Sequence, residues 1–298
     1  MQVSMLPQYV QGVMSDDPKE QFRAAVKIRK LLAIEGPPIQ EVVDAGIVPQ
    51  LVLCLQSDQA PLQFEAAWAL TNVASGNSDH VRVIVESGAV PILVQLLSSD
   101  NDDVVEQACW ALGNIAGDSS TCRDIVLQKG VLKPLLAQLH TENKFSILQT
   151  GVWTLKNLCG KKPPPLFECV SPALETLNKL LLNFHNDEIF TDICLCLQGL
   201  SDGPNEQIAT VVESGVTMRL VELLMHPSPL VQIPALRAVG NIVSGDDLQT
   251  QIVINCGALP NLLSLLSSNN KVIKKVACWT ISNITCGTKD QIQAVIDA

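Results

Sequence analysis

The sequence is poor in aromatic residues, in histidine and in long apolar runs. Aromatic side chains make up only 4% of its 298 residues, and there are four histidines. No run of 18 uncharged apolar residues occurs, so we expect no transmembrane helix and no membrane partner. The start, Met1-Gln2-Val3-Ser4, lacks the charged first part and apolar centre of a signal peptide.

The motifs of the common enzyme classes are also missing. None of the histidines lies in an H-E-x-x-H motif, and the chain has neither a glycine-rich nucleotide loop nor a G-x-S-x-G nucleophile turn. We therefore predict that the protein is not an enzyme and uses no cofactor and no metal. Ten cysteines occur without a C-x-x-C pair, mostly in apolar stretches such as those around Cys109 and Cys278. This pattern predicts free, buried thiols.

Positive charge is scarce relative to negative charge. The chain has 20 basic and 30 acidic residues, and its formal net charge is −10. Because nucleic-acid phosphates repel an acidic protein, we expect no direct nucleic-acid partner. The apolar share of 47% excludes disorder for most of the chain.

What the sequence does contain is an internal repeat. Trp68, Trp110 and Trp153 are 42 and 43 residues apart, and further steps of 42 reach Leu195, Arg237 and Trp279. The surrounding text recurs as EAAWALTNVASG, EQACWALGNIAGD, PALRAVGNIVSG and VACWTISNITCG. A second marker, AGIVP, SGAVP, KGVLKP, SGVTM and CGALP, repeats in step with the first. A fixed period of this length indicates a repeat architecture.

Each repeat is predicted to be helical, because apolar residues recur at helical spacing and no run alternates with period two. We expect two longer helices preceded by a short one, with glycine ending the short helix and proline starting the next. Such units bury their apolar faces only by stacking, which gives an all-α, right-handed solenoid of the armadillo-repeat type. Repeats of paired helices with a less regular third segment are the close alternative. About seven units fit into a single domain, 1–298, and the proline-rich stretch 160–165 is interpreted as a loop.

The third helix of four units carries the motif W-x-x-x-N, which we name the Trp/Asn row: Trp68/Asn72, Trp110/Asn114, Trp153/Asn157 and Trp279/Asn283. Residues four apart share a helix face, so each tryptophan lies one turn from its asparagine. Ala108, Leu112 and Ile115 supply a separate core stripe, so the row is expected on the inner surface of the solenoid. The alternative is that these tryptophans are core residues and that the asparagines cap or bridge helices.

The chemistry of the row suits an extended basic peptide. An asparagine side chain can pair with both the N–H and the C=O of a peptide backbone. Parallel indoles form slots for the methylene stems of lysine or arginine. Packed helices lie about 8–10 Å apart, and alternate residues of an extended chain lie about 6.6–7 Å apart. One peptide can therefore run across several units. Candidate partners for the charged tips are Asp118, Glu188, Asp192, Asp246 and Asp247.

These stretches resemble the importin-α family of nuclear-import adaptors. The resemblance rests on FEAAWALTNVASG, EQACWALGNIAGDSSTCRD, LSDGPNEQI, PALRAVGNIVSGDD and KKVACWTISNITCGTKDQIQAVI, and it covers nearly the whole chain from LPQYVQGVMSDDP onward. It implies a nuclear-import adaptor that shuttles between cytoplasm and nucleus. Its concave acidic groove would bind the lysine- and arginine-rich nuclear localisation signals of cargo proteins.

The resemblance also implies two peptide sites. The major site would comprise Trp68, Asn72, Gly76, Gln107, Trp110, Asn114, Asp118, Trp153 and Asn157, with Glu188 and Asp192 at its far end. The minor site would comprise Arg237, Asn241, Asp247, Trp279 and Asn283. In the family, the acid at Asp118 pairs with the key lysine, helped by backbone near Gly76 and by a threonine.

The chain departs from the family pattern at several places. Val81 stands at the threonine position, and Gly160 stands where the family has an arginine. Leu195 and Gly199 replace one Trp/Asn pair, and this break divides the groove into two shorter sites. No basic arm for importin-β precedes Leu6, and the chain stops inside the first helix of an eighth unit. From this we expect an open groove and a weak minor site.

A competing hypothesis is a general armadillo scaffold. Scaffolds that resemble β-catenin tend to present a basic groove to acidic partners. The acidic total and the Trp/Asn row favour a basic peptide instead. The sequence leaves the oligomeric state open.

Overall fold

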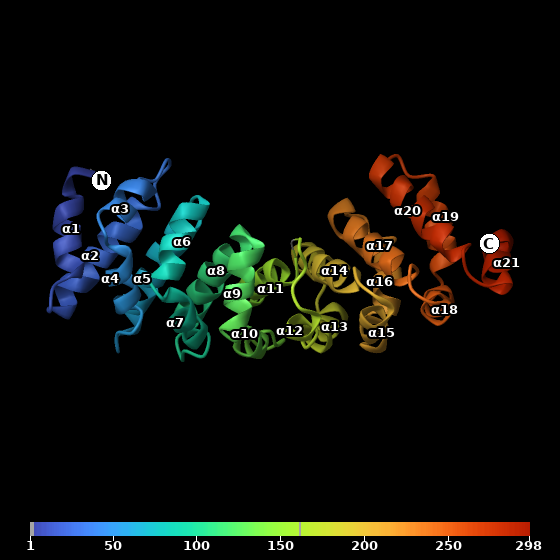
Figure 1. The fold of residues 1–298 in the computed structure, drawn as a ribbon, viewed down its shortest axis with the longest axis horizontal. Helices are drawn as coiled ribbons and strands as arrows, with labels where there is room; N and C mark the ends of the chain where they lie inside the picture. Colours follow the sequence, from blue (N-terminus) through green and yellow to red (C-terminus); the bar gives the residue numbers. More distant parts are fainter. Residues whose placement is uncertain (1–2, 161) are drawn as a thin grey trace. The chain divides into compact units, whose positions relative to one another are not determined.

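The structure, a computed structural model, describes residues 3–160 and 162–298. The chain forms two compact units, the first ending at Leu158 and the second beginning at Cys159. Every regular element in the described residues is helical, as the sequence predicts (Figure 1). None of these helices is long and apolar enough to cross a bilayer.

Among its described residues, the first unit holds a short 3-10 helix and eleven α-helices, the last of which ends one residue into the second unit: η1 (Val3–Met5), α1 (Leu6–Val13), α2 (Pro18–Leu31), α3 (Ile39–Asp44), α4 (Val48–Cys54), α5 (Ala60–Ala74), α6 (Ser78–Glu86), α7 (Ala89–Leu96), α8 (Asp102–Asp118), α9 (Ser120–Gln128), α10 (Leu132–Gln138) and α11 (Phe145–Cys159). The second unit holds the remaining helices: α12 (Phe167–Val170), α13 (Ala173–Asn183), α14 (Asp187–Ser201), α15 (Asn205–Glu213), α16 (Thr217–Leu223), α17 (Pro229–Ile242), α18 (Asp247–Asn255), α19 (Ala258–Leu266), α20 (Lys271–Ile284) and α21 (Lys289–Asp297).

The repeat of the sequence is a repeat of three helices. Its long third helices carry the positions spaced by 42 or 43 residues, from Val26 to Trp279: α2, α5, α8 and α11 in the first unit, and α14, α17 and α20 in the second. Within the first unit, α5 packs against α2 and α8. Within the second, α17 packs against α14 and α20. This stacking covers the apolar faces that a lone repeat leaves open.

The helix lengths correct one expectation. The sequence predicts two longer helices after a short one, and the repeat of α12, α13 and α14, with 4, 11 and 15 residues, follows that pattern. In the other repeats the second helix is about as short as the first. In the repeat of α6, α7 and α8, the three helices have 9, 8 and 17 residues. The second helix ends early because a polar turn follows it, in which the Asn101 side chain accepts hydrogen bonds from the N–H groups of Asp103 and Val104 and so starts α8. Gly88, with φ of 79°, makes the left-handed bend between α6 and α7.

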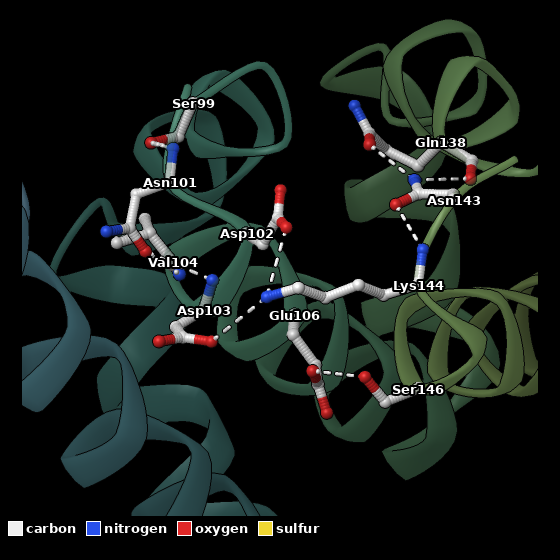
Figure 2. A network of polar contacts seen from close by, with 10 residues as sticks. All are labelled: Ser99, Asn101, Asp102, Asp103, Val104, Glu106, Gln138, Asn143, Lys144 and Ser146. Atoms are coloured by element: carbon white, nitrogen blue, oxygen red, sulfur yellow. Dashed lines mark hydrogen bonds and ion pairs between the residues drawn. The ribbon is translucent and has the colours of Figure 1, made fainter.

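The predicted core stripe is confirmed, because Ala108, Leu112 and Ile115 are fully buried. Polar contacts at the surface also connect neighbouring repeats. Figure 2 shows Lys144, just before α11, reaching the first turn of α8, where its Nζ lies 3.0 Å from Asp102 and 3.7 Å from Asp103. The hydrogen bond to Asp102 is the largest cause that raises the pKa of Lys144. Ser146 donates a hydrogen bond of 2.8 Å to Glu106 in the same network.

The cysteines are buried only in part, which corrects the expectation of buried thiols. Cys109 is fully buried, and burial raises its pKa to about 12, so the thiol stays protonated at neutral pH. Cys278, at the equivalent place in its repeat, is exposed. Cys109 lies against the repeat of α11, whose Thr154 hydroxyl donates to the Cys109 carbonyl.

Candidate peptide-binding groove

Two of the four tryptophans of the Trp/Asn row are exposed, which argues against the alternative that the indoles are core. Trp110 and Trp279 are 44% and 43% exposed, and Trp68 and Trp153 are half-buried. Two of the rings, Trp153 and Trp279, pack against the preceding repeat by one edge. A Cβ added at Gly113 would collide with Cζ3 of Trp153, and one at Gly240 would collide with Cζ3 of Trp279. The row therefore presents indole surface to solvent in both units.

Three asparagines of the row, Asn114, Asn157 and Asn283, have the bridging role that was the alternative interpretation, and so does Asn241 at the equivalent place in α17. The Asn114 side chain donates to the Thr71 carbonyl at 3.1 Å, and Asn157 donates to the Gly113 carbonyl at 3.0 Å. In the second unit, Asn241 donates to the Gln198 carbonyl at 3.0 Å and Asn283 to that of Gly240 at 3.5 Å. Each of these bonds needs one amide hydrogen. A carboxamide has two hydrogens and a carbonyl oxygen, so bridging and peptide binding are compatible.

Five predicted residues of the major site surround one open hollow of about 480 Å³, which we name the Asp118 hollow. They come from three successive repeats: Gly76 after α5, Asn114 and Asp118 on α8, and Trp153 and Asn157 on α11. Ala74, Ser75, Gly113 and Gly117 complete the lining. The hollow thus combines one carboxylate, two carboxamides and an indole.

The carboxylate of Asp118 is held in place at the end of α8. The Ser78 hydroxyl donates to its Oδ1 at 2.7 Å, and the Cys122 thiol lies 3.7 Å from its Oδ2. Asp118 itself is half-buried, so its charge is only partly solvated. Sequence reasoning missed Ser78. Val81, which the resemblance predicts to stand in place of a threonine, is buried, and Ser78 supplies the hydroxyl that donates to Asp118.

Four other predicted residues of the major site in the first unit, Trp68, Asn72, Gln107 and the exposed Trp110, lie outside the lining of the Asp118 hollow. Gln107 is buried, and its Oε1 is a buried acceptor for which the described residues supply no hydrogen bond. The Nδ2 of Asn72 is likewise buried, and the described residues supply no hydrogen-bond acceptor for it. Trp68 packs edge-on against Phe64, with ring centroids 5.4 Å apart.

A second residue that sequence reasoning missed is Arg29 on α2. Its guanidinium makes two hydrogen bonds with Glu65, of 2.7 and 3.0 Å, and its Cζ lies 4.4 Å from the centroid of the Trp68 ring. The ion pair is nearly buried, with side-chain exposures of 16% and 8%. One face of the first indole in the row therefore already carries a cation of the chain itself.

The predicted minor site lies wholly in the second unit and is only partly assembled. Asp247 and Asn283 line a hollow of about 150 Å³ together with Gly245 and Gly287. Arg237 is exposed, Asn241 is half-buried, and Trp279 rests on Gly240 outside that lining. Glu188 and Asp192 also belong to this unit, on the first two turns of α14. Their assignment to the major site stays a prediction.

Among the described residues, no group of three or more histidine, cysteine or acidic side chains is placed to hold a metal ion.

Comparison with known proteins agrees with the fold. The sequence pattern of the armadillo/β-catenin-like repeat matches residues 37–75, 77–117, 204–244 and 246–286. The chain therefore belongs to the armadillo-repeat family, and its all-α solenoid fold is confirmed. An engineered protein of known structure covers the whole chain with a TM-score of 0.91 and 30% identity, with 72% of that protein matched.

Within this family, the chain is similar to importin α subunits. It is 60% identical to importin subunit alpha-1b of Oryza sativa subsp. japonica and 57% identical to importin subunit alpha-3 of Arabidopsis thaliana, in each case over 250 residues. These matches cover 83% of this chain and 47% of each relative, so the chain spans about half the length of the curated relatives. A designed armadillo repeat protein, solved in complex with the peptide (KR)4, matches 93% of this chain and 98% of its own length, with a TM-score of 0.54 and 28% identity.

Proposed function

We propose that this protein binds lysine- and arginine-rich segments of cargo proteins and acts as a nuclear-import adaptor. The observation that carries the proposal is the Asp118 hollow, where a carboxylate, the side chains of Asn114 and Asn157 and the Trp153 indole face one open space. The asparagines pair with the peptide backbone, the indole supports an aliphatic stem, and Asp118 receives an ammonium group.

The comparisons support the same proposal. The relatives with about 60% identity are importin α subunits, and a designed armadillo protein binds a peptide of alternating lysine and arginine. We accordingly propose nuclear localisation signals as ligands, importin-β as a partner, and shuttling between cytoplasm and nucleus. The assigned residues are those of the major and minor sites given above, and the second hollow, around Asp247, is the weaker site because it is smaller.

Binding of a labelled lysine-rich peptide, followed by fluorescence anisotropy, tests the proposal. We expect saturable binding that weakens as salt is raised from about 0.05 to 0.5 M, because salt screens the attraction between the acidic groove and the peptide. A glutamate-rich peptide of equal length is the control and should not bind. Preference for the acidic peptide would contradict the proposal and favour the scaffold that presents a basic groove to acidic partners.

A further inference from the structure

In two of the third helices, the residue three places after the row position lies against the next tryptophan of the row. In α8 this residue is Gly113, where a Cβ would collide with the ring of Trp153. In α17 it is Gly240, where a Cβ would collide with the ring of Trp279. The absence of a side chain at both places lets one edge of the indole pack close to the helix.

In α2 the same position holds Arg29, three residues after Val26. Its guanidinium lies over the next tryptophan, with Cζ 4.4 Å from the centroid of the Trp68 ring. The same guanidinium donates two hydrogen bonds, of 2.7 and 3.0 Å, to the carboxylate of Glu65 on α5. Glu65 is only 6% exposed, so the ion pair is nearly closed to solvent. One face of Trp68 is therefore covered by a cation whose charge is already neutralised.

The Trp68 indole and the Glu65 carboxylate form what we name the Trp68 slot, and Arg29 fills it. The slot has the chemistry that we assign to the Asp118 hollow, where a basic residue of the ligand would lie against the Trp153 indole and pair with a carboxylate. An arginine that pairs with a carboxylate through two hydrogen bonds and also stacks on an indole is held by both interactions. A ligand residue would have to break both to enter the slot.

We propose that Arg29 is a specificity-determining residue, which fills the Trp68 slot so that the basic run of a bound segment ends at Trp68. This inference rests on the proposed function. The ligand residue that follows on the α2 side of Trp68 finds neither an open indole face nor a free carboxylate, so the protein does not select for its charge. Occupancy of the slot sets this limit rather than repulsion, because Glu65 neutralises the guanidinium.

The test opens the slot and offers it a ligand residue. Arg29→Ala frees the indole face and the Glu65 carboxylate, whereas Arg29→Lys keeps a cation and an aliphatic stem there. Arg82→Ala is the matched control, because Arg82 belongs to an exposed ion pair with Asp79 on α6 and its loss changes the net charge equally. Each protein is titrated by anisotropy with pentalysine peptides extended at one end by alanine and then arginine, or by two alanines. The alanine spacer is used because alternate residues of an extended chain point the same way.

For one of the two ends, the extension with arginine should bind Arg29→Ala about tenfold tighter than the extension with two alanines, the effect of one ion pair supported by an indole. In the unchanged protein, in Arg29→Lys and in Arg82→Ala, the added arginine should gain no more than about twofold at either end, through general attraction to an acidic protein. An equal gain in Arg29→Lys and Arg29→Ala would contradict the role of Arg29.

Loss of Arg29 leaves Glu65 buried without its partner, which lowers stability, so a second variant accompanies the first. Arg29→Ala/Glu65→Ala removes both charges and leaves the indole face open. The arginine at the same end should then gain about two- to fivefold from the ring alone. Circular dichroism shows which variants fold, and if Arg29→Ala does not, the double variant decides.

Two failures of this experiment have different meanings. If the folded variants that lack Arg29 bind the pentalysine peptides but gain nothing from the arginine at either end, the role of Arg29 is wrong while the proposed function stands. If no protein in the series binds these peptides, both are wrong.

Discussion

Replacing Asp118 with lysine should weaken the binding of a lysine-rich peptide by at least about a hundredfold. Asp118 is the acid of the hollow that Asn114 and Trp153 also line, and its carboxylate is oriented by the Ser78 hydroxyl at 2.7 Å. A hydrogen bond between charged groups is worth about 1.5–3 kcal/mol, and reversing the charge adds repulsion to that loss. Together these effects correspond to about two or more orders of magnitude in Kd.

The control for this variant is Asp58→Lys, which makes the same change of charge at an exposed residue between α4 and α5. It should bind within about a factor of two of the unchanged protein, because exposed distant charges are largely screened. Circular dichroism should report the same helix content for both variants. Undiminished affinity in Asp118→Lys would refute the assignment of Asp118 as the lysine partner.

Replacing Gly113 with valine should cost about 1–3 kcal/mol of stability, the usual range for overpacking a filled site. A Cβ at this position meets Cζ3 and Cε3 of Trp153 and Oγ1 of Thr154. The Thr154 hydroxyl already donates to the Cys109 carbonyl at 2.8 Å, so it has little freedom to move away. The indole must then shift, and the wall of the Asp118 hollow shifts with it. Peptide affinity should fall by about tenfold as the stacking surface is lost.

Two measurements separate these effects. Urea unfolding gives the stability of Gly113→Val, and anisotropy gives its affinity for the peptide. In a Trp153→Ala background the same glycine replacement should cost less, since the ring that it strikes is gone. An equal cost in both backgrounds would show that the Trp153 ring does not depend on Gly113 for its place.

Much of the fold follows from the sequence because stacking imposes one register on every repeat. The step of 42 or 43 residues from Trp68 to Trp153 places the third helices, and the burial of Leu112 and Ile115 follows from helical spacing. The lengths of the first and second helices do not follow in this way. They depend on where a turn such as Ser99–Asn101 caps the next helix, and apolar periodicity carries little information on this.

The missed residues of the site share a physical reason. Ser78 and Asp118 are 40 residues apart, and Arg29 and Glu65 are 36 apart, so both pairs join neighbouring repeats. The sequence does contain a signal for such contacts, namely polar residues that are separated by about one repeat length. A search for pairs at that separation would have found both of them.

The central claim is that the Trp/Asn row is an open track for an extended basic peptide, and a crystal structure with a bound lysine-rich peptide tests it most directly. The account predicts an extended peptide whose backbone pairs with the side chains of Asn114 and Asn157. One of its lysines should place its ammonium within about 3 Å of the Asp118 carboxylate. A peptide bound on another surface, with the Asp118 hollow left to solvent, would contradict the claim.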